Sequence, residues 1–222
     1  MGGNGTRPSV SMETFGNQEG QPEVALQTVL IMLKNGNRGI MVNCLLDEGS
    51  DTTYVNEDVV NELGLTGKKE PITVKVANDQ TLRFMSSSFE IGLESTDGRV
   101  DTKITPKTSN FCGGLKAVNW VKIKDRWNHL TGIPFPRLAK GSQINVLLRV
   151  DHRELIFSMK EVTGGPNEPC ARLCNLGWTA SEKIQNLDTK ESHYTGFFHH
   201  TFRLQIEKRD PTLPERDTLE LN

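Results

Sequence analysis

The residues of this 222-residue chain that are best suited to chemistry lie in one short acidic segment, Asp47-Glu48-Gly49-Ser50. Apolar residues lead directly into Asp47, so its carboxyl group is expected at the end of a buried strand. Gly49 can adopt a positive φ, and the hydroxyls of Ser50 and Thr52 can hold the loop. A carboxyl group held in this way can give or take a proton, as general acid–base catalysis requires. A plain turn, in which Asp47 bonds its own backbone, is the competing interpretation.

Two strands are predicted before the acidic segment. Residues 24–33 are rich in β-branched and apolar side chains, and residues 39–46 form a second apolar run that ends at Asp47. Asn35-Gly36 between them is typical of a two-residue hairpin turn. The apolar end of the second run predicts a strand that is buried on both faces.

A short strand and a helix are predicted after the segment. Tyr54-Val55 continues the β pattern, and Asn56 is suited to the N-cap of a helix whose first turn is acidic. Val59 and its apolar neighbours supply a buried face, and Gly64 is suited to the position just after the helix. A helix of about two turns is therefore expected.

Further hairpins are predicted downstream. Residues 72–76 alternate between apolar and polar side chains, and residues 84–93 do so more loosely. The turn between them contains Asn and Asp, which tolerate a left-handed backbone, and comprises Ala77, Asn78, Asp79 and Gln80. Asp97-Gly98 predicts another turn, before a strand at 100–104.

The pattern is less regular in the second half. Residues 106–143 hold three of the ten prolines, with Trp120 and Trp127, and no sustained period, which predicts an irregular insertion packed partly through its aromatic side chains. A strand is expected again at 144–148, followed by Asp151.

The composition excludes several function classes. A formal net charge of −2 gives no basic surface for nucleic acid, and no apolar run is long enough to span a membrane. The four cysteines predict reduced thiols rather than a disulfide scaffold. Cys170 and Cys174 lack the spacing of a zinc site, so neither a metal nor a cofactor is expected.

Taken together and in order, these segments resemble the retropepsin-like aspartic protease domain of BEL/Pao retrotransposon polyproteins. That family has a Leu-Leu-Asp-x-Gly-Ser loop, a helix ending in Leu-Gly-Leu, a later hydrophobic strand ending in Gly-x-Asp, and a Leu-Gly-Trp element. The matching segments here are Leu45–Ser50, Leu63–Leu65, Ile144–Asp151, Glu168-Pro169 with Leu176–Trp178, and His200–Glu207.

The resemblance implies a mainly β fold, the retropepsin-like closed β-barrel of acid proteases, with one or two short helices and an irregular insertion. It divides the chain into a disordered leader or linker at 1–22, a protease domain at 23–162 with the insertion at 106–143, and a C-terminal extension at 163–222. The extension would connect the domain to a reverse transcriptase region.

The resemblance also implies the roles of the site residues. Asp47 would be catalytic and would pair with Asp47 of a second copy, so the active enzyme would be a homodimer that cleaves a polyprotein. Glu48, Gly49, Ser50 and Thr52 would support the loop, and residues 77–80 would form a flap. The strand that crosses the loop would contribute Leu147, Leu148, Arg149 and Asp151. A cytoplasmic location follows, in virus-like particles among other settings, with no membrane or nucleic-acid partner for this domain.

Two positions depart from the family pattern. Glu48 stands where retropepsins have Ser or Thr, and in a dimer it would place extra carboxylates beside the Asp47 pair, raising their pKa values and weakening association at neutral pH. Arg149 stands where the family has Gly; it is expected to take packing room or to pair with Asp47, Glu48 or Asp151. A second hypothesis is therefore an inactive binding or dimerisation domain, or a decayed transposon copy. A third is an unrelated β-rich interaction domain.

Overall fold

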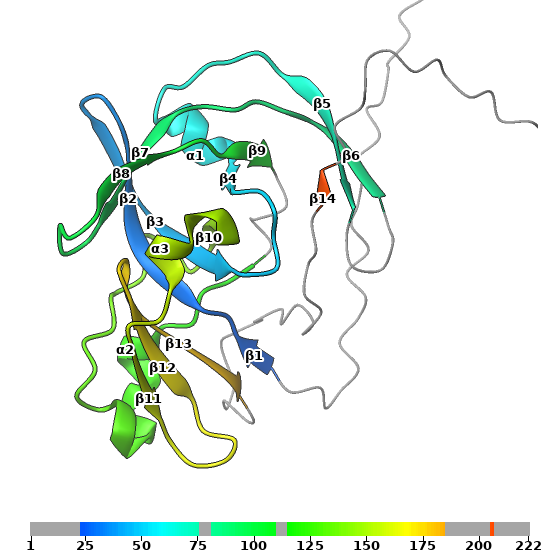
Figure 1. The fold of residues 1–222 in the computed structure, drawn as a ribbon. Helices are drawn as coiled ribbons and strands as arrows, with labels where there is room; N and C mark the ends of the chain where they lie inside the picture. The colour runs from blue at the N-terminus through cyan, green and yellow to red at the C-terminus, as the bar shows by residue number, and fades with distance from the viewer. Residues whose placement is uncertain (1–22, 76–80, 110–114, 185–204, 207–222) are drawn as a thin grey trace, which may run out of the picture.

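The computed structural model describes residues 23–75, 81–109, 115–184 and 205–206, which form a mainly β structure with a few short helices (Figure 1). Its largest sheet has the strand order β8-β7-β2-β3-β10-β4-β9. These strands are β2 (Thr28–Asn35), β3 (Arg38–Asp47), β4 (Tyr54–Asn56), β7 (Ile91–Ser95), β8 (Asp101–Ile104), β9 (Lys107–Ser109) and β10 (Ile144–Arg149).

Two smaller sheets and several short helices complete the described part of the chain. One sheet, in the order β1-β13-β12-β11, contains β1 (Glu23–Ala25), β11 (Lys160–Thr163), β12 (Cys170–Cys174) and β13 (Gly177–Ile184). The other, β14-β5-β6, contains β5 (Glu70–Lys75), β6 (Thr81–Ser86) and β14 (Gln205–Ile206). The α-helices are α1 (Glu57–Glu62), α2 (Trp120–Ile123) and α3 (Arg153–Ile156), and the 3-10 helices are η2 (Lys124–Arg126), η3 (Asn128–Leu130) and η4 (Val150–His152). No helix among the described residues has the length and apolar character to cross a membrane.

The predicted hairpin before Asp47 is confirmed, with its turn one residue later than expected. Asn35 pairs with Arg38 at the end of the β2–β3 ladder, so Gly36 and Asn37 form the turn. Gly36 has a φ of +56°, whereas Asn37 has no positive φ. A turn with positive φ at its first central residue matches the right-handed twist of the strands, and glycine adopts it without steric cost.

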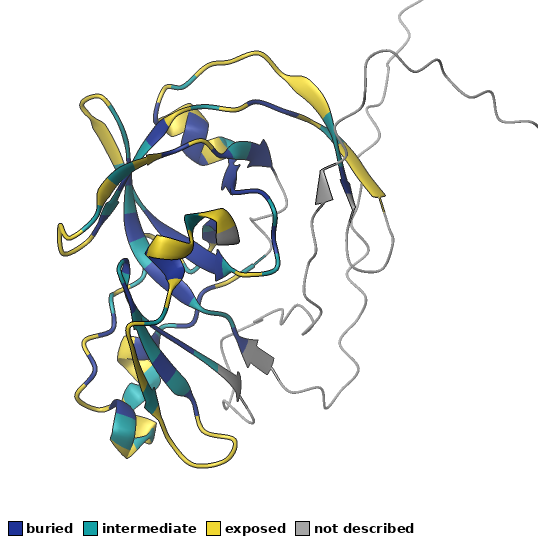
Figure 2. Cartoon of the chain, in the orientation of Figure 1, coloured by how far each residue is buried: buried dark blue, intermediate teal, exposed yellow. Residues whose placement is uncertain are grey.

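The apolar run into Asp47 is buried on both faces, as predicted. In β3, Cys44 and Leu46 pack into one core cluster, and Leu45 between them packs into another. In β10, Leu148 joins the first cluster and Leu147 the second. Burial of consecutive residues is expected for strands inside a sheet that is covered on both sides. Figure 2 shows the end of β3 in dark blue, and β10 pairs with this part of β3 in parallel.

The helix after the acidic segment is also confirmed, and its ends explain its length. Asn56 is at the N-cap position, although its side chain makes no capping hydrogen bond. At the other end Gly64 has a φ of +70°, its N–H donates to the Asn61 carbonyl, and the Leu65 N–H donates to the Val60 carbonyl. These two bonds form a Schellman motif, which a glycine at this position favours.

The prediction of one strand over residues 84–93 was wrong. β6 ends at Ser86, and β7 begins at Ile91 in a different sheet. The break is held by polar groups: the Ser86 hydroxyl donates to the Thr108 carbonyl at 2.9 Å, and the Ser87 N–H donates to the Thr108 hydroxyl at 2.9 Å. The residues between the strands alternate loosely in polarity, which hid the change of sheet.

The hairpin of β12 and β13 was not predicted, because its turn residues, Asn175 and Leu176, are not a typical hairpin pair. β13 also pairs with β1, Ala25 lying opposite Glu182, so this sheet joins residues from both sides of the predicted boundary at 162. This sheet packs against the insertion through a third core cluster, separate from the two described above. In it the rings of Trp120 and Phe135 are stacked with centroids 5.7 Å apart. The prediction that aromatic side chains pack the insertion is confirmed. The insertion is not irregular throughout, because β9, which lies at its start, belongs to the large sheet.

Truncation in the central strand should be far more costly than truncation at the surface. Leu148 is fully buried in β10, whereas Met159 is 49% exposed. We expect Leu148→Ala to lower the free energy of unfolding by about 2–5 kcal/mol, because it leaves a cavity between packed strands. Met159→Ala should change it by no more than about 0.5 kcal/mol. Urea unfolding followed by tryptophan fluorescence measures both, and equal losses would contradict the central place given to β10.

Candidate active site

The acidic loop lies between β3 and β4, and β10 is inserted between those two strands. β10 runs parallel to β3, with Leu148 opposite Leu46 and Arg149 opposite Asp47. On its other side β10 is antiparallel to β4, with Leu147 opposite Tyr54. The predicted strand at 144–148 therefore crosses beneath the loop that carries Asp47. This topology brings residues about a hundred positions apart to one place.

Hydrogen bonds within the loop fix its shape. The Gly49 N–H donates to Oδ1 of Asp47 at 3.0 Å. The Ser50 hydroxyl donates to the Thr52 carbonyl at 2.8 Å and accepts the Thr52 N–H at 3.3 Å. Ser50 and Thr52 are both buried. Short side-chain oxygens bonded to nearby backbone groups are a common means of ordering a loop. The bond between Asp47 and the Gly49 N–H is also the one that the plain-turn interpretation predicts, and Gly49 does not have the positive φ expected of it.

Asp47 is half-buried, in an environment that favours its protonated form. Its pKa is raised above the ordinary value of 3.8, mainly because burial removes solvent from the carboxylate. The Gly49 N–H opposes this shift by bonding the carboxylate, and the negative charge of Glu48 adds to it. Glu48 itself is exposed. Burial next to a like charge is typical of carboxyl groups that act as acids or bases near neutral pH.

Arg149 meets the carboxylate of Asp151, which lies two residues later, in the 3-10 helix η4. Its Nε is 2.5 Å from Oδ1 of Asp151, and its Nη1 donates to the Asp51 carbonyl. The Arg149 N–H donates to the Thr53 hydroxyl at 3.2 Å. Of the three partners expected for the guanidinium, the structure shows Asp151 and not Asp47 or Glu48. The predicted site residues Leu147 and Leu148 are buried in β10 and do not reach the surface.

Asp51 and Thr53 were not among the predicted site residues. Asp51 acts through its backbone carbonyl, which every residue has, so its residue type gave no signal. Thr53 is buried, and its hydroxyl meets a strand about a hundred residues away, which no local pattern predicts. The predicted flap residues 77–80 lie outside the described residues, although β5 and β6 on either side of them form an antiparallel hairpin, with Lys75 opposite Thr81.

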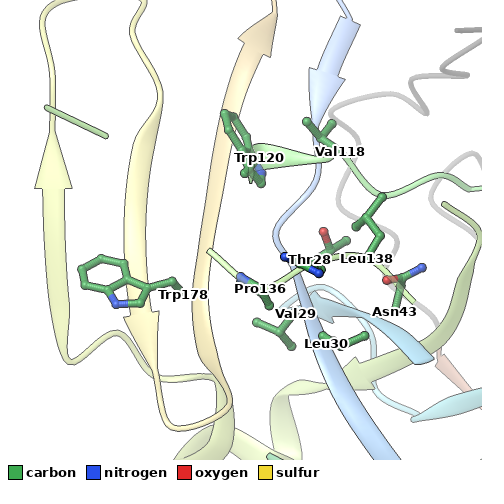
Figure 3. Close-up of a pocket in the computed structure, with 10 residues that line it drawn as sticks. Thr28, Val29, Leu30, Asn43, Val118, Trp120, Pro136, Leu138 and Trp178 are labelled. Carbon is green, nitrogen blue, oxygen red and sulfur yellow. The ribbon is translucent and has the colours of Figure 1, made fainter. Parts of the chain in front are cut away.

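Other possible sites are weaker. Cys170 and Cys174 are the two ends of β12 and must lie roughly 13 Å apart along an extended strand, too far for one metal ion. No cluster of three or more metal-ligating side chains occurs in the described ranges. The cavity in Figure 3, lined by Thr28, Asn43, Trp120 and Trp178 among others, has a volume of about 10 Å³, enough for about one water molecule. Asp47 does not line it.

Comparisons with known proteins add no assignment: no family model, no curated protein and no solved structure matches this chain. The functional argument therefore depends on the geometry of the loop and on the sequence.

The raised pKa of Asp47 has a measurable effect on stability. The folded state keeps this proton to higher pH than the unfolded state, so folding loses free energy as the pH rises from below 3.8 through the raised pKa. Asn at this position cannot ionise and can still accept the Gly49 N–H. We therefore expect Asp47→Asn to be more stable than wild type at pH 7, and this difference to vanish below pH 3.8.

Urea unfolding at pH 7 and at pH 3.5 tests this expectation, since roughly equal stability is required once both states are protonated. The control is Asp101→Asn, on the exposed edge strand β8, which should change little at either pH. A variant at Asp47 that is less stable than wild type at pH 7 would show that its carboxylate is stabilising, contrary to the burial described above.

Proposed function

We propose that this chain is a retropepsin-like aspartic endopeptidase of a retroelement, which hydrolyses peptide bonds of a polyprotein as a homodimer. The observation that carries the proposal is the crossing of β10 beneath the loop that ends β3, with Asp47 at the crossing point. The resemblance to BEL/Pao protease domains requires this topology, because there a hydrophobic strand passes under the aspartate loop. The raised pKa of Asp47 supports the same proposal from electrostatics.

The proposed reaction uses two copies of Asp47 that share one proton. Two carboxyl groups a few ångströms apart cannot both ionise easily, so one is protonated and the other is not. The ionised carboxylate takes a proton from a water molecule, whose oxygen attacks the carbonyl carbon of the peptide bond. The protonated carboxyl group gives its proton to the carbonyl oxygen. Transfer of a proton to the amide nitrogen then allows the C–N bond to break.

A second copy is needed because the described residues contain one loop of this kind. The complete fold we propose is the closed barrel of retropepsins, with the β5–β6 hairpin as the base of a flap that closes over the peptide and excludes water. No metal or cofactor takes part in the proposed chemistry, and an intracellular site of action suits the reduced thiols. Among the described cysteines, Cys170 and Cys174 are free thiols.

The alternative is a protease-derived domain that retains the fold and has lost catalysis, as a binding or dimerisation module or as a decayed copy. Glu48 favours this alternative, because it is exposed next to Asp47 where two copies would have to meet. Repulsion between four carboxyl groups at such an interface would oppose dimerisation at neutral pH.

Hydrolysis should depend on Asp47 in both copies. We expect Asp47→Asn to lower cleavage of the chain's own polyprotein by at least about a hundredfold, because the acid–base pair is lost. Equal amounts of wild type and Asp47→Asn are mixed and allowed to exchange partners. The mixture should have about a quarter of the activity of the same total amount of wild type, since only one dimer in four has both carboxyl groups.

Mass spectrometry of the cleavage products and their rate of formation give both results. Asp101→Asn, mixed in the same way, serves as the control and should leave the activity unchanged. Retention of half of the activity in the Asp47 mixture would mean that each copy works alone. Equal cleavage by wild type and by pure Asp47→Asn would favour the inactive alternative or another enzyme in the sample.

Self-association should respond to the charge of Glu48. We expect Glu48→Gln to associate at least about tenfold more tightly than wild type at pH 7, because the variant removes a like-charged pair from the proposed interface. The gain should shrink in high salt, which screens exposed charges. Sedimentation equilibrium measures both effects, with Glu161→Gln on β11 as a control for an exposed carboxylate away from the loop. If the wild type and Glu48→Gln both remain monomeric, Asp47 has no partner and the proposed dimer is contradicted.

A further inference from the structure

Two kinds of hydrogen bond hold the acidic loop: bonds between residues of the loop itself, and bonds to Arg149 in β10. Ser50 and Thr52 bond each other, which shapes the loop but does not attach it to the sheet. Arg149, the last residue of β10, donates its backbone N–H to the Thr53 hydroxyl and its side-chain Nη1 to the Asp51 carbonyl. Only the second of these bonds depends on the arginine side chain. Arg149 also lies directly opposite Asp47 in the β3–β10 ladder.

Arginine is suited to this task in a way that glycine is not. Its guanidinium is planar and carries several N–H groups in fixed directions, so one side chain can bond two acceptors at once. Here Nη1 donates to the Asp51 carbonyl, and Nε lies 2.5 Å from the Asp151 carboxylate in an ion pair that lacks hydrogen-bond geometry. The Arg149 side chain is only 33% exposed, which reduces screening of the ion pair by solvent. The Asp151 carboxylate thereby holds the guanidinium in the orientation that reaches the loop.

Glu48 explains why such an anchor is useful in this chain. Glu48 is exposed and makes no hydrogen bond or ion pair with the other described residues, so it does not tie the loop to the sheet. The loop therefore needs support that does not come from a second copy. Arg149 supplies it from within one chain.

We propose that Arg149 is a positioning residue, which holds the loop so that Asp47 keeps its place over β10 before a second copy arrives. The catalytic consequence rests on the proposed function, but the order of the loop can be measured without any activity. The proposal predicts that Arg149→Gly, which restores the residue of the related family, weakens the site instead of improving it.

The test measures hydrogen exchange of the loop amides and steady-state kinetics in the full chain. Arg149→Gly should speed exchange at residues 48–53 by at least about tenfold, with the β2–β3 hairpin unchanged. It should lower kcat by about tenfold or more and change KM by no more than about twofold, because a misplaced carboxyl group affects the reacting geometry more than substrate binding. Arg149→Lys, which keeps the charge but loses the fork of N–H groups, should fall between wild type and Arg149→Gly in both measurements.

Arg172→Gly is the matched control. Arg172 also lies in a strand, its Nε is 3.0 Å from Oε1 of Glu161, and its side chain is 34% exposed. Like Arg149→Gly, the control loses an ion pair and gains a flexible glycine. Arg172, however, lies in the sheet β1-β13-β12-β11, away from the acidic loop. It should leave exchange at residues 48–53 and kcat unchanged.

Each result decides between the alternatives. Unchanged loop exchange in Arg149→Gly, or a higher kcat, overturns the proposal. Faster loop exchange with an unchanged kcat overturns the catalytic part. If Arg149→Gly does not fold, the comparison of Arg149→Lys with wild type carries the test. If wild type shows no Asp47-dependent hydrolysis, the proposed function and the catalytic role both fail, and loop exchange alone decides whether Arg149 holds the loop.

Discussion

The structure depends on the insertion of β10 between β3 and β4. A strand in that position bonds neighbours on both sides and is covered on both faces, so few of its groups are left to water. β3, β10 and β4 contribute to two core clusters, one on each side of the sheet. The loop at Asp47 is the connection that has to pass around the end of β10. Its position is therefore set by the sheet rather than by its own sequence.

This origin explains the electrostatics of the loop. A connection between two buried strands lies close to apolar side chains, and the carboxyl group at its start loses solvent as a result. The local N–H of Gly49 recovers part of that loss. Arg149 is close by along the ladder but is directed to Asp51 and Asp151, so the positive charge nearest in register does not cancel the effect of burial on Asp47.

The sequence predicted the local features of the site well and its long-range features unevenly. The strand into Asp47, the helix that ends at Gly64 and the strand at 144–148 follow from patterns of a few residues, and all three are found. The break after Ser86 was not predicted, because the Thr108 groups that hold it are distant in the sequence. The β12–β13 hairpin was not predicted, because its turn at Asn175-Leu176 lacks a typical hairpin pair. The contacts of Arg149 were predictable in part only. Its type suggested an ion pair, but only the fold selects Asp151 and the Asp51 carbonyl from the acceptors within reach.

The separation of β3 from β10 along the chain has a consequence in time. During synthesis, Asp47 leaves the ribosome about a hundred residues before Arg149, and no earlier segment takes the place of β10 in the described structure. Contacts between residues so far apart form late, because a long stretch of chain has to be closed first. The nascent loop therefore has neither its supporting strand nor its arginine. The acidic loop therefore cannot reach its final place until most of the domain around it has been made.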